Sequence, residues 1–474
     1  MRLRTWRLFA AATLTVSTIG VAGIASGETT PAQPAPTPGI GCDAGSLPET
    51  TQGRAPYGDY DSGRAALGYT CNATQVAHFG GTSGGYRVER YVDAAGHECA
   101  YYDSTLLFPA TAGGQGTETT GVYAMDLTDP AKPVHTDTLR TPAMQSPHES
   151  LRLNTARGLL VADMGYPTTQ PGFVDVYSVT KDCRHPELLS STPIGILGHE
   201  SGFSPDGNTY WVASLSGKTL AAIDLTEPRV PSLLWLSRDY TPHGVSISND
   251  GNRLYMADNG NKGLTILDVS QIQARAANPQ VPVVSHLTWP EVGTPQNATP
   301  FTRDGHPYLM EIDEFGSGAK IGAARIIDIA DEKAPTVVSN MRLAVNQASA
   351  QGADLEKDPG NDQLFQGYQG HYCSLPSRVN PNVIACSFIM SGLRVFDIRD
   401  PLNPVEIAYF NKPLLPGKGV NPKQAGSFAM SAPAYDDETG DIWYSDGNSG
   451  FYVVRLTKGA HVNTFAKKVL LPGN

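Results

Sequence analysis

The sequence is poor in charged residues and contains no basic cluster. Only 17% of its 474 residues are charged, whereas about a quarter is usual. Acidic residues outnumber basic ones, 46 to 35, and the net charge is −11. We therefore expect neither nucleic acid nor an anionic membrane surface to be a partner.

Long apolar runs are also missing beyond the first 27 residues. Those residues begin with Arg2, Arg4 and Arg7, and an apolar stretch from Leu8 to Ala25 follows. This pattern is typical of a secretory signal peptide over residues 1–27, with an uncleaved N-terminal anchor as the alternative. A Pro-rich spacer (28–45) and a single domain (46–474) complete the predicted organisation. No membrane span is expected after cleavage, and we predict a location outside the cell or at the cell envelope.

Familiar catalytic signatures are absent as well. The sequence has no P-loop, no GxSxG, no HExxH and no CxxC motif. It has instead 49 glycines and 36 prolines within a chain that is 40% hydrophobic. Such a turn-rich composition indicates many short strands rather than a helical bundle.

Six cysteines in an exported chain favour disulfide bonds. Cys373 and Cys386 flank the turn signal RVNPN at 378–382. A hairpin folded at that turn places the two cysteines opposite each other, so we predict a disulfide between them. The other four cysteines allow three pairings, among which the sequence does not choose: Cys42, Cys71, Cys99 and Cys183.

The strongest signal is an internal repeat. A short strand resembling GLTILDV (263–269) recurs seven times at intervals of 44 to 69 residues. An apolar strand precedes each copy, often after an Asp-Gly turn, and most copies lead into a further outer strand. Four-stranded units at this period are propeller blades. The reference positions of the copies are Asp126, Ser178, Asp224, Asp268, Asp328, Asp397 and Arg455.

We therefore predict an all-β, seven-bladed β-propeller of four-stranded antiparallel blades. The repeated aspartates are expected to end their strands in turns rather than to take part in chemistry. Residues 74–80 precede the first blade, and we predict that they form the outer strand of the last blade and close the ring. The C-terminal segment 465–472 competes for that place.

The repeated text, including GLRVFDIRDPLNP (392–404), resembles that of the LVIVD-repeat proteins. The similarity covers most of residues 80–457, although Ser178 and Arg455 depart from the repeat. The resemblance implies a propeller fold and an exported or surface location. It implies no particular reaction, because members of that family mostly have none assigned.

One pattern goes beyond what folding requires. The first strand of four predicted blades begins with a histidine, and the matching position of blade five is an asparagine. Because first strands line the channel of a propeller, these side chains are expected to form a ring. Imidazoles arranged in this way suit a transition metal such as copper or zinc. The ring comprises His148, His199, His243, His371 and Asn297.

Glu149 and Glu200 follow two of these histidines, where they could orient the rings or add oxygen ligands. Two alternatives to a metal site remain open. The histidines could bond the backbone of the next blade as part of the repeat, or they could bind an organic ligand or an anion.

Weaker candidates lie elsewhere in the chain. Carboxylates near the ends of second strands are expected to cap turns: Asp103, Asp163, Asp258, Asp313 and Asp446. The stretch 310–318 could bind Ca²⁺ through Glu311, Asp313 and Glu314, although it lacks the spacing of a known calcium loop. The polar loop 346–363 is a candidate for specificity.

Two functions follow from these observations. The first is a secreted, monomeric binding module that recognises a protein, a peptide or a glycan at the cell envelope or outside the cell. The alternative is an oxidoreductase or hydrolase that depends on copper or another transition metal, held by the histidine cluster in the central channel.

Overall fold

The computed structural model describes most of the chain between residues 33 and 457. The described ranges are 33–80, 85–104, 121–145, 147–163, 172–316, 321–350, 358, 367–413, 426–436 and 438–457. The predicted signal peptide, the segment 465–472 and most of the loop 346–363 lie outside these residues. In the part that the structure describes, none of the helices has the length and hydrophobicity to cross a membrane.

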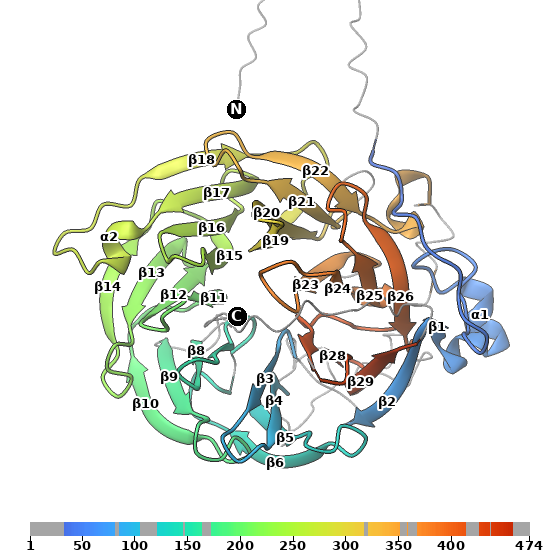
Figure 1. The fold of residues 1–474 in the computed structure, drawn as a ribbon, viewed down its shortest axis with the longest axis horizontal. Helices are drawn as coiled ribbons and strands as arrows, with labels where there is room; N and C mark the ends of the chain where they lie inside the picture. The colour runs from blue at the N-terminus through green and yellow to red at the C-terminus, as the bar shows by residue number, and fades with distance from the viewer. Residues whose placement is uncertain are drawn as a thin grey trace, which may run out of the picture. The chain divides into compact units, whose positions relative to one another are not determined.

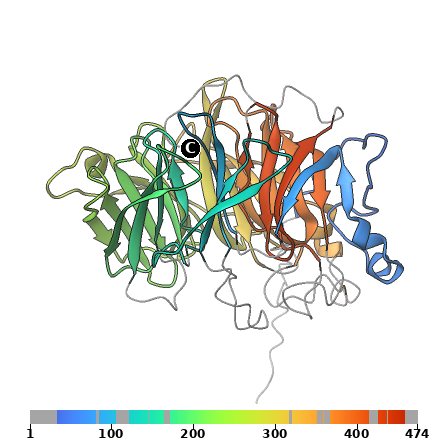
Figure 2. The same ribbon diagram turned by 90° about the horizontal axis from the view of Figure 1, so that it is seen from below.

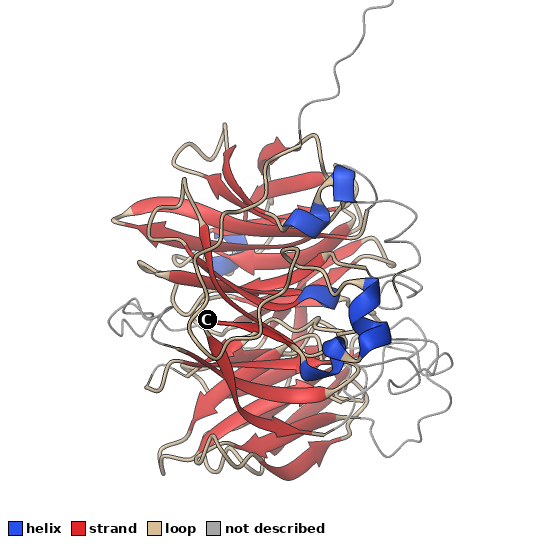
Figure 3. Cartoon of the chain, turned by 90° about the vertical axis from the view of Figure 1, so that its right-hand side faces the viewer, coloured by secondary structure: helices blue, strands red, loops and turns tan. Residues whose placement is uncertain are grey.

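Seven antiparallel sheets follow one another round a ring, which confirms the predicted seven-bladed propeller (Figure 1). Seen from the side, the strands run between the two faces of the ring (Figure 2). Helices are few and short (Figure 3). They include α1 (Tyr57–Ser62) and α2 (Ser270–Gln273), both on the outside of the ring.

The first three blades take their strands in chain order. Blade one contains β3 (Val88–Val92), β4 (Glu98–Asp103), β5 (Val122–Asp126) and β6 (Val134–Leu139). Blade two contains β7 (Arg152–Asn154), β8 (Leu159–Asp163), β9 (Phe173–Ser178) and β10 (Glu187–Pro193). Blade three contains β11 (Glu200–Phe203), β12 (Thr209–Ser214), β13 (Thr219–Asp224) and β14 (Ser232–Ser237).

The remaining blades repeat this order from the channel outwards. Blade four contains β15 (Pro242–Ile247), β16 (Arg253–Asp258), β17 (Gly263–Asp268) and β18 (Val283–Leu287). Blade five contains β19 (Thr294–Arg303), β20 (His306–Glu314), β21 (Ala324–Asp328) and β22 (Thr336–Met341). Blade six contains β23 (Gly370–Ser374), β24 (Val383–Phe388), β25 (Gly392–Asp397) and β26 (Val405–Asn411). Blade seven takes β27 (Ala434–Tyr435), β28 (Asp441–Asp446) and β29 (Gly450–Leu456) from this end of the chain.

The seven repeated strands are the third strands of the blades. Where the reference position is an aspartate, that residue ends the strand, and its carboxylate stabilises the turn that follows. Asp126, Asp224 and Asp397, for example, each accept a hydrogen bond at 2.9 Å from the backbone N–H two residues later. This geometry is an Asx turn, so the structural role expected for these carboxylates is the one observed.

Apolar side chains fill the spaces between neighbouring blades. Tyr255 and Ile266 of blade four pack in one cluster with Leu309 and Ile327 of blade five. Because each blade is covered on both faces, its second and third strands are mostly apolar, as in β12 (TYWVAS) and β13 (TLAAID), and few charges are needed.

The last blade is completed by the N-terminal part of the domain. Strand β2 (Ala73–Phe79) pairs antiparallel with β29, which confirms the predicted closure. An unexpected addition lies beside it, where β1 (Tyr69–Cys71) pairs with β26 as a fifth strand of blade six.

All six cysteines form disulfides. Cys373 faces Cys386 across the β23–β24 hairpin and is bonded to it, as predicted. The structure also chooses among the open pairings. Cys42 is bonded to Cys71 next to β1, and Cys99 of β4 is bonded to Cys183 beyond β9, so that blades one and two are linked.

Candidate metal centre

The four predicted histidines lie together at the inner ends of blades two, three, four and six. His243 belongs to β15 and His371 to β23. His199 directly precedes β11, and His148 lies four residues before the start of β7. The ring centroids of His148 and His199 are 4.5 Å apart, and those of His199 and His243 are 4.4 Å apart. The repeat thus brings four imidazoles into one cluster.

Glu149 lies at the middle of this cluster. Its Oε2 is 3.2 Å from His199 Nε2, and its Oε1 is 3.2 Å from His371 Nε2. The same Oε2 lies 3.8 Å from Nδ1 of both His148 and His243. One carboxylate is therefore close to all four imidazoles.

A second carboxylate, Glu314, completes the cluster. It stands at the end of β20, and its Oε1 is 3.0 Å from His243 Nε2, while its Oε2 is 3.3 Å from His371 Nε2. From the sequence, Glu314 is a candidate only for a calcium ligand, together with Glu311 and Asp313. The structure separates these three residues, because Glu311 and Asp313 are ion-paired with the buried Arg325. The calcium interpretation is therefore wrong.

The remaining polar residues form a layer behind the histidines. Arg87, just before β3, pairs with Glu200 and donates from Nε to the backbone oxygen of Glu149 at 2.9 Å. Asn297 donates its amide to Glu200, so its part in the ring is to hold a carboxylate rather than to face the imidazoles. Gln296 donates to Glu149 Oε1 at 2.8 Å.

The backbone around the cluster leaves no room for larger residues. A Cβ added to Gly244 would lie 1.7 Å from Glu200 Oε2. One added to Gly198 would lie 1.8 Å from Asp163 Oδ1. His148 adopts a positive φ of 52°, a conformation that a residue with a side chain adopts only when its surroundings impose it.

Burial and mutual contact perturb the protonation of the cluster in opposite directions. Burial lowers the pKa of His148 to about 3. Burial also acts to lower the pKa of His243 and His371, but contacts with Glu314 and with Glu200 or Glu149 raise these pKa values to about 10 and about 9. In these contacts the raised pKa values of His243 and His371 favour their protonated forms, which place positive charge between the carboxylates.

Several buried atoms in the cluster lack a hydrogen-bond partner among the described residues. They are His148 Nδ1, His243 Nδ1, Glu149 Oε2 and Glu200 Oε2. Leaving such atoms unpartnered away from water costs about 1–3 kcal/mol each. Two overlapping sets, His148–Glu149–His199 and Glu149–Glu200–His243, each have donor atoms within 4.8 Å of one another. The arrangement fits the coordination of a metal ion.

Sequence reasoning identified the histidines but missed Glu314, Arg87 and Gln296 as parts of the site. Arg87 could have been found by extending the histidine register back to blade one, where YRVERYV (86–92) begins the inner strand. Glu314 gave no such signal, because it comes from the end of a second strand rather than from a repeated position.

The other candidate carboxylates have local roles. Asp258 Oδ1 and Asp446 Oδ1 each accept a backbone N–H two residues later, as expected for turn capping. Asp163 accepts from the Ser201 hydroxyl at 2.7 Å, and Asp313 accepts from Trp289 Nε1 at 2.9 Å. Turn capping is thus confirmed for Asp258 and Asp446, whereas Asp163 and Asp313 accept hydrogen bonds from side chains of neighbouring segments.

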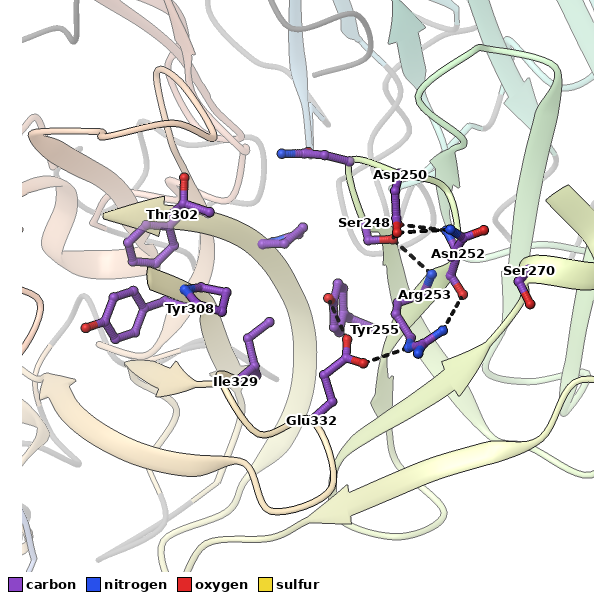
Figure 4. Close-up of a pocket in the computed structure, with 14 residues that line it drawn as sticks. Ser248, Asp250, Asn252, Arg253, Tyr255, Ser270, Thr302, Tyr308, Ile329 and Glu332 are labelled. Carbon is purple, nitrogen blue, oxygen red and sulfur yellow. Dashed lines mark hydrogen bonds and ion pairs between the residues drawn. The ribbon is translucent and has the colours of Figure 1, made fainter. Parts of the chain in front are cut away.

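A separate groove of about 450 Å³ lies between blades four and five (Figure 4). Tyr255, Phe301 and Tyr308 contribute to its walls. On its rim, Arg253 Nε is 2.7 Å from Glu332 Oε2, so the charged groups there already neutralise each other.

Comparison with known proteins adds little to this geometry. No family model and no curated protein sequence matches the chain. Among solved structures, it is similar to a proposed 6-phosphogluconolactonase of Bacteroides uniformis, with 13% identity over 69% of this chain and 85% of the other and a TM-score of 0.49. The Kuenenia stuttgartiensis hydrazine synthase gives 12% identity over 79% and 96%, with a TM-score of 0.47. The periplasmic gluconolactonase of Pseudomonas aeruginosa gives 14% over 72% and 94%, with a TM-score of 0.44.

All three scores are below 0.5, so function has to be argued from the residues of this chain. Its fold and its site define a class: a seven-bladed β-propeller with a buried His/Glu cluster in the channel.

Proposed function

We propose that this protein is an exported enzyme that depends on a transition metal bound in its channel. The observation that carries the proposal is the gathering of four imidazoles round the buried carboxylates of Glu149 and Glu314, where His148 Nδ1 and His243 Nδ1 have no hydrogen-bond partner among the described residues. Imidazole nitrogens and carboxylate oxygens gathered in this way are donors that transition-metal ions prefer.

The types of donor atom restrict which metal ions suit the site. All the donors are imidazole nitrogens and carboxylate oxygens, and all six cysteines are consumed in disulfides. Nitrogen and oxygen donors suit Zn²⁺, Cu²⁺, Fe²⁺ and Mn²⁺ better than soft Cu⁺. Such an ion supplies Lewis-acid chemistry for hydrolysis or, if it is copper or iron, redox chemistry.

The protein's own residues prepare the site for that role. His371 donates from Nδ1 to the carbonyl of Met430 at 2.6 Å, which leaves Nε2 facing the cluster. His199 is the most accessible of the four histidines, with 17% of its side chain exposed. We place the open coordination position, and the approach of substrate, on the His199 side of the cluster.

Elemental analysis of protein purified without a histidine tag tests the proposal. We expect a stoichiometric transition metal that is lost in the His199→Ala and His243→Ala variants. The matched control is His306→Ala, because His306 is exposed and contacts Asp328 on the outside of blade five. Wild-type protein that retains less than about 0.1 ion per chain after loading with zinc and with copper would refute the proposal.

Binding of a protein, peptide or glycan is the second candidate function, and the groove between blades four and five favours it. The groove places the edges of the largely buried Tyr255 and Tyr308 next to polar groups such as Ser248 and Asn252, a combination that suits sugar rings. If binding to an oligosaccharide panel occurs and is lost in Tyr308→Ala but not in His243→Ala, recognition and the metal centre are separate functions.

A further inference from the structure

We propose that the cluster holds two metal ions, bridged by the carboxylates of Glu149 and Glu314. This inference rests on the proposed function, because it specifies how many ions the same residues bind and how they are shared.

The first argument is the number of donors. Four imidazoles and two carboxylates offer eight donor atoms around one enclosed space. A transition-metal ion in a protein takes about four to six. Five of the six residues are at least nine-tenths buried, and His199 is the exception. Eight donors therefore exceed what one ion uses.

The second argument is the way in which the donors divide. On one side, His371 Nε2 lies 3.2 Å from Glu149 Oε1 and 3.3 Å from Glu314 Oε2. His371 Nε2 thus lies beside one oxygen of each carboxylate, and these three atoms form the first group.

On the other side, His199 Nε2 lies 3.2 Å from both Glu149 Oε2 and His243 Nε2. His243 Nε2 in turn lies 3.0 Å from Glu314 Oε1. His148 Nδ1 reaches the same side through Glu149 Oε2, at 3.8 Å. These atoms form the second group.

Each carboxylate thus gives one oxygen to each group. This is the geometry of a bridging carboxylate, in which the two oxygens bind different ions. Apart from the 3.8 Å between His148 Nδ1 and Glu149 Oε2, the separations of 3.0–3.3 Å within the groups match the edge of a tetrahedron with metal–ligand bonds of about 2.0 Å, which is about 3.3 Å. Two ions bridged in this way lie about 3.5–4 Å apart.

The third argument concerns charge. Glu200 Oε1 is bound by Arg87 and by the amide of Asn297, so its charge is already balanced. Glu149 and Glu314 have no arginine or lysine of their own in the contacts that the structure describes. They face only imidazoles and the amide of Gln296. Glu149 and Glu314 therefore have no fixed cation beside them in the described contacts, as expected for ligands that bridge ions.

The experiment loads untagged, chelator-treated protein with Cu²⁺ and measures copper content and electron paramagnetic resonance on the same sample. We expect about two copper ions per chain and an integrated signal well below the copper content, because bridged ions couple their spins. The Glu314→Gln variant loses one bridge. We therefore expect one copper ion per chain and an integrated signal equal to the copper content. Glu332→Gln, a surface carboxylate of the same blade, should behave as the wild type.

The outcomes separate the two proposals. One ion per wild-type chain with a full signal overturns the two-ion inference and leaves the metal centre in place. Two ions with a full signal show two unbridged sites and also overturn it. No bound copper overturns the two-ion inference, and no bound ion after loading with zinc as well overturns both proposals. Circular dichroism checks the folding of each variant, and Glu149→Gln, for which we also expect fewer than two ions, takes the place of Glu314→Gln if that variant does not fold.

Discussion

Asp163 provides a test of the buried electrostatics that does not involve the metal. This carboxylate ends β8 and is fully buried. Burial raises its pKa from 3.8 to about 7, although hydrogen bonds with Ser201, Ser150 and Tyr210 act in the opposite direction. Its Oδ1 has no hydrogen-bond partner among the described residues. The folded protein therefore holds Asp163 in its protonated form up to nearly neutral pH.

The sign of the pH dependence follows from that shift. Because the folded-state pKa lies above the unfolded-state pKa, the contribution of Asp163 to the free energy of unfolding is fully present below about pH 4. It is lost as the pH rises through about 7. At about 1.4 kcal/mol per pKa unit, the rise from 3.8 to about 7 corresponds to about 4 kcal/mol.

The substitution Asp163→Asn removes this dependence, because the amide keeps the shape of the carboxyl and stays neutral. We expect the variant to gain up to about 4 kcal/mol relative to the wild type between pH 4 and pH 8. Urea unfolding of both proteins at intervals of one pH unit measures the difference. The control is Leu160→Val, a packing change in the same strand, whose effect should not vary with pH. A constant difference between Asp163→Asn and the wild type across this range would show that the carboxyl is not held protonated.

Three further predictions concern the ring and the turns. Replacing Cys373 and Cys386 together by serine should lower the free energy of unfolding by about 3 kcal/mol, as expected for a short closed loop, and urea titration would detect it. Gly244→Ala should abolish metal uptake in elemental analysis while the far-ultraviolet circular dichroism stays that of a β protein, because its Cβ would displace the Glu200 carboxylate; unchanged uptake would contradict the tight packing described. Asp224→Ala should cost about 1 kcal/mol by losing the hydrogen bond to Thr226 N, and a midpoint equal to that of the wild type would rule out this turn as a contributor.

Much of the fold could be predicted because its signals are local and repeated. Seven similar strands fix the number of blades, and a turn halfway between Cys373 and Cys386 fixes one disulfide. The closing strand near Thr74 was predictable for another reason, since blade seven otherwise lacked an outer strand. Strand β1 could not be predicted, because its partner β26 lies more than 300 residues away in the sequence and β1 is not part of the internal repeat.

The site was predictable to the same extent. The histidines share a register, so four of them could be placed together from the sequence. Glu314 reaches the cluster because β20 is long, with nine residues, and its end lies beside the inner strands of neighbouring blades. That length depends on the pairing of β19 with β20. No short sequence motif indicates how far this pairing extends.

The closure of the ring has a consequence for the order of folding. Strand β2 comes from the beginning of the domain and β29 from its end, and they pair only when both are present. Contacts this distant in sequence form slowly. A partly synthesised chain can build blades two to five and bring His148, His199 and His243 near one another. His371 and the Met430 carbonyl that orients it arrive later. The complete His/Glu cluster therefore exists only in a finished molecule, so the metal site proposed above would form only once the ring has closed.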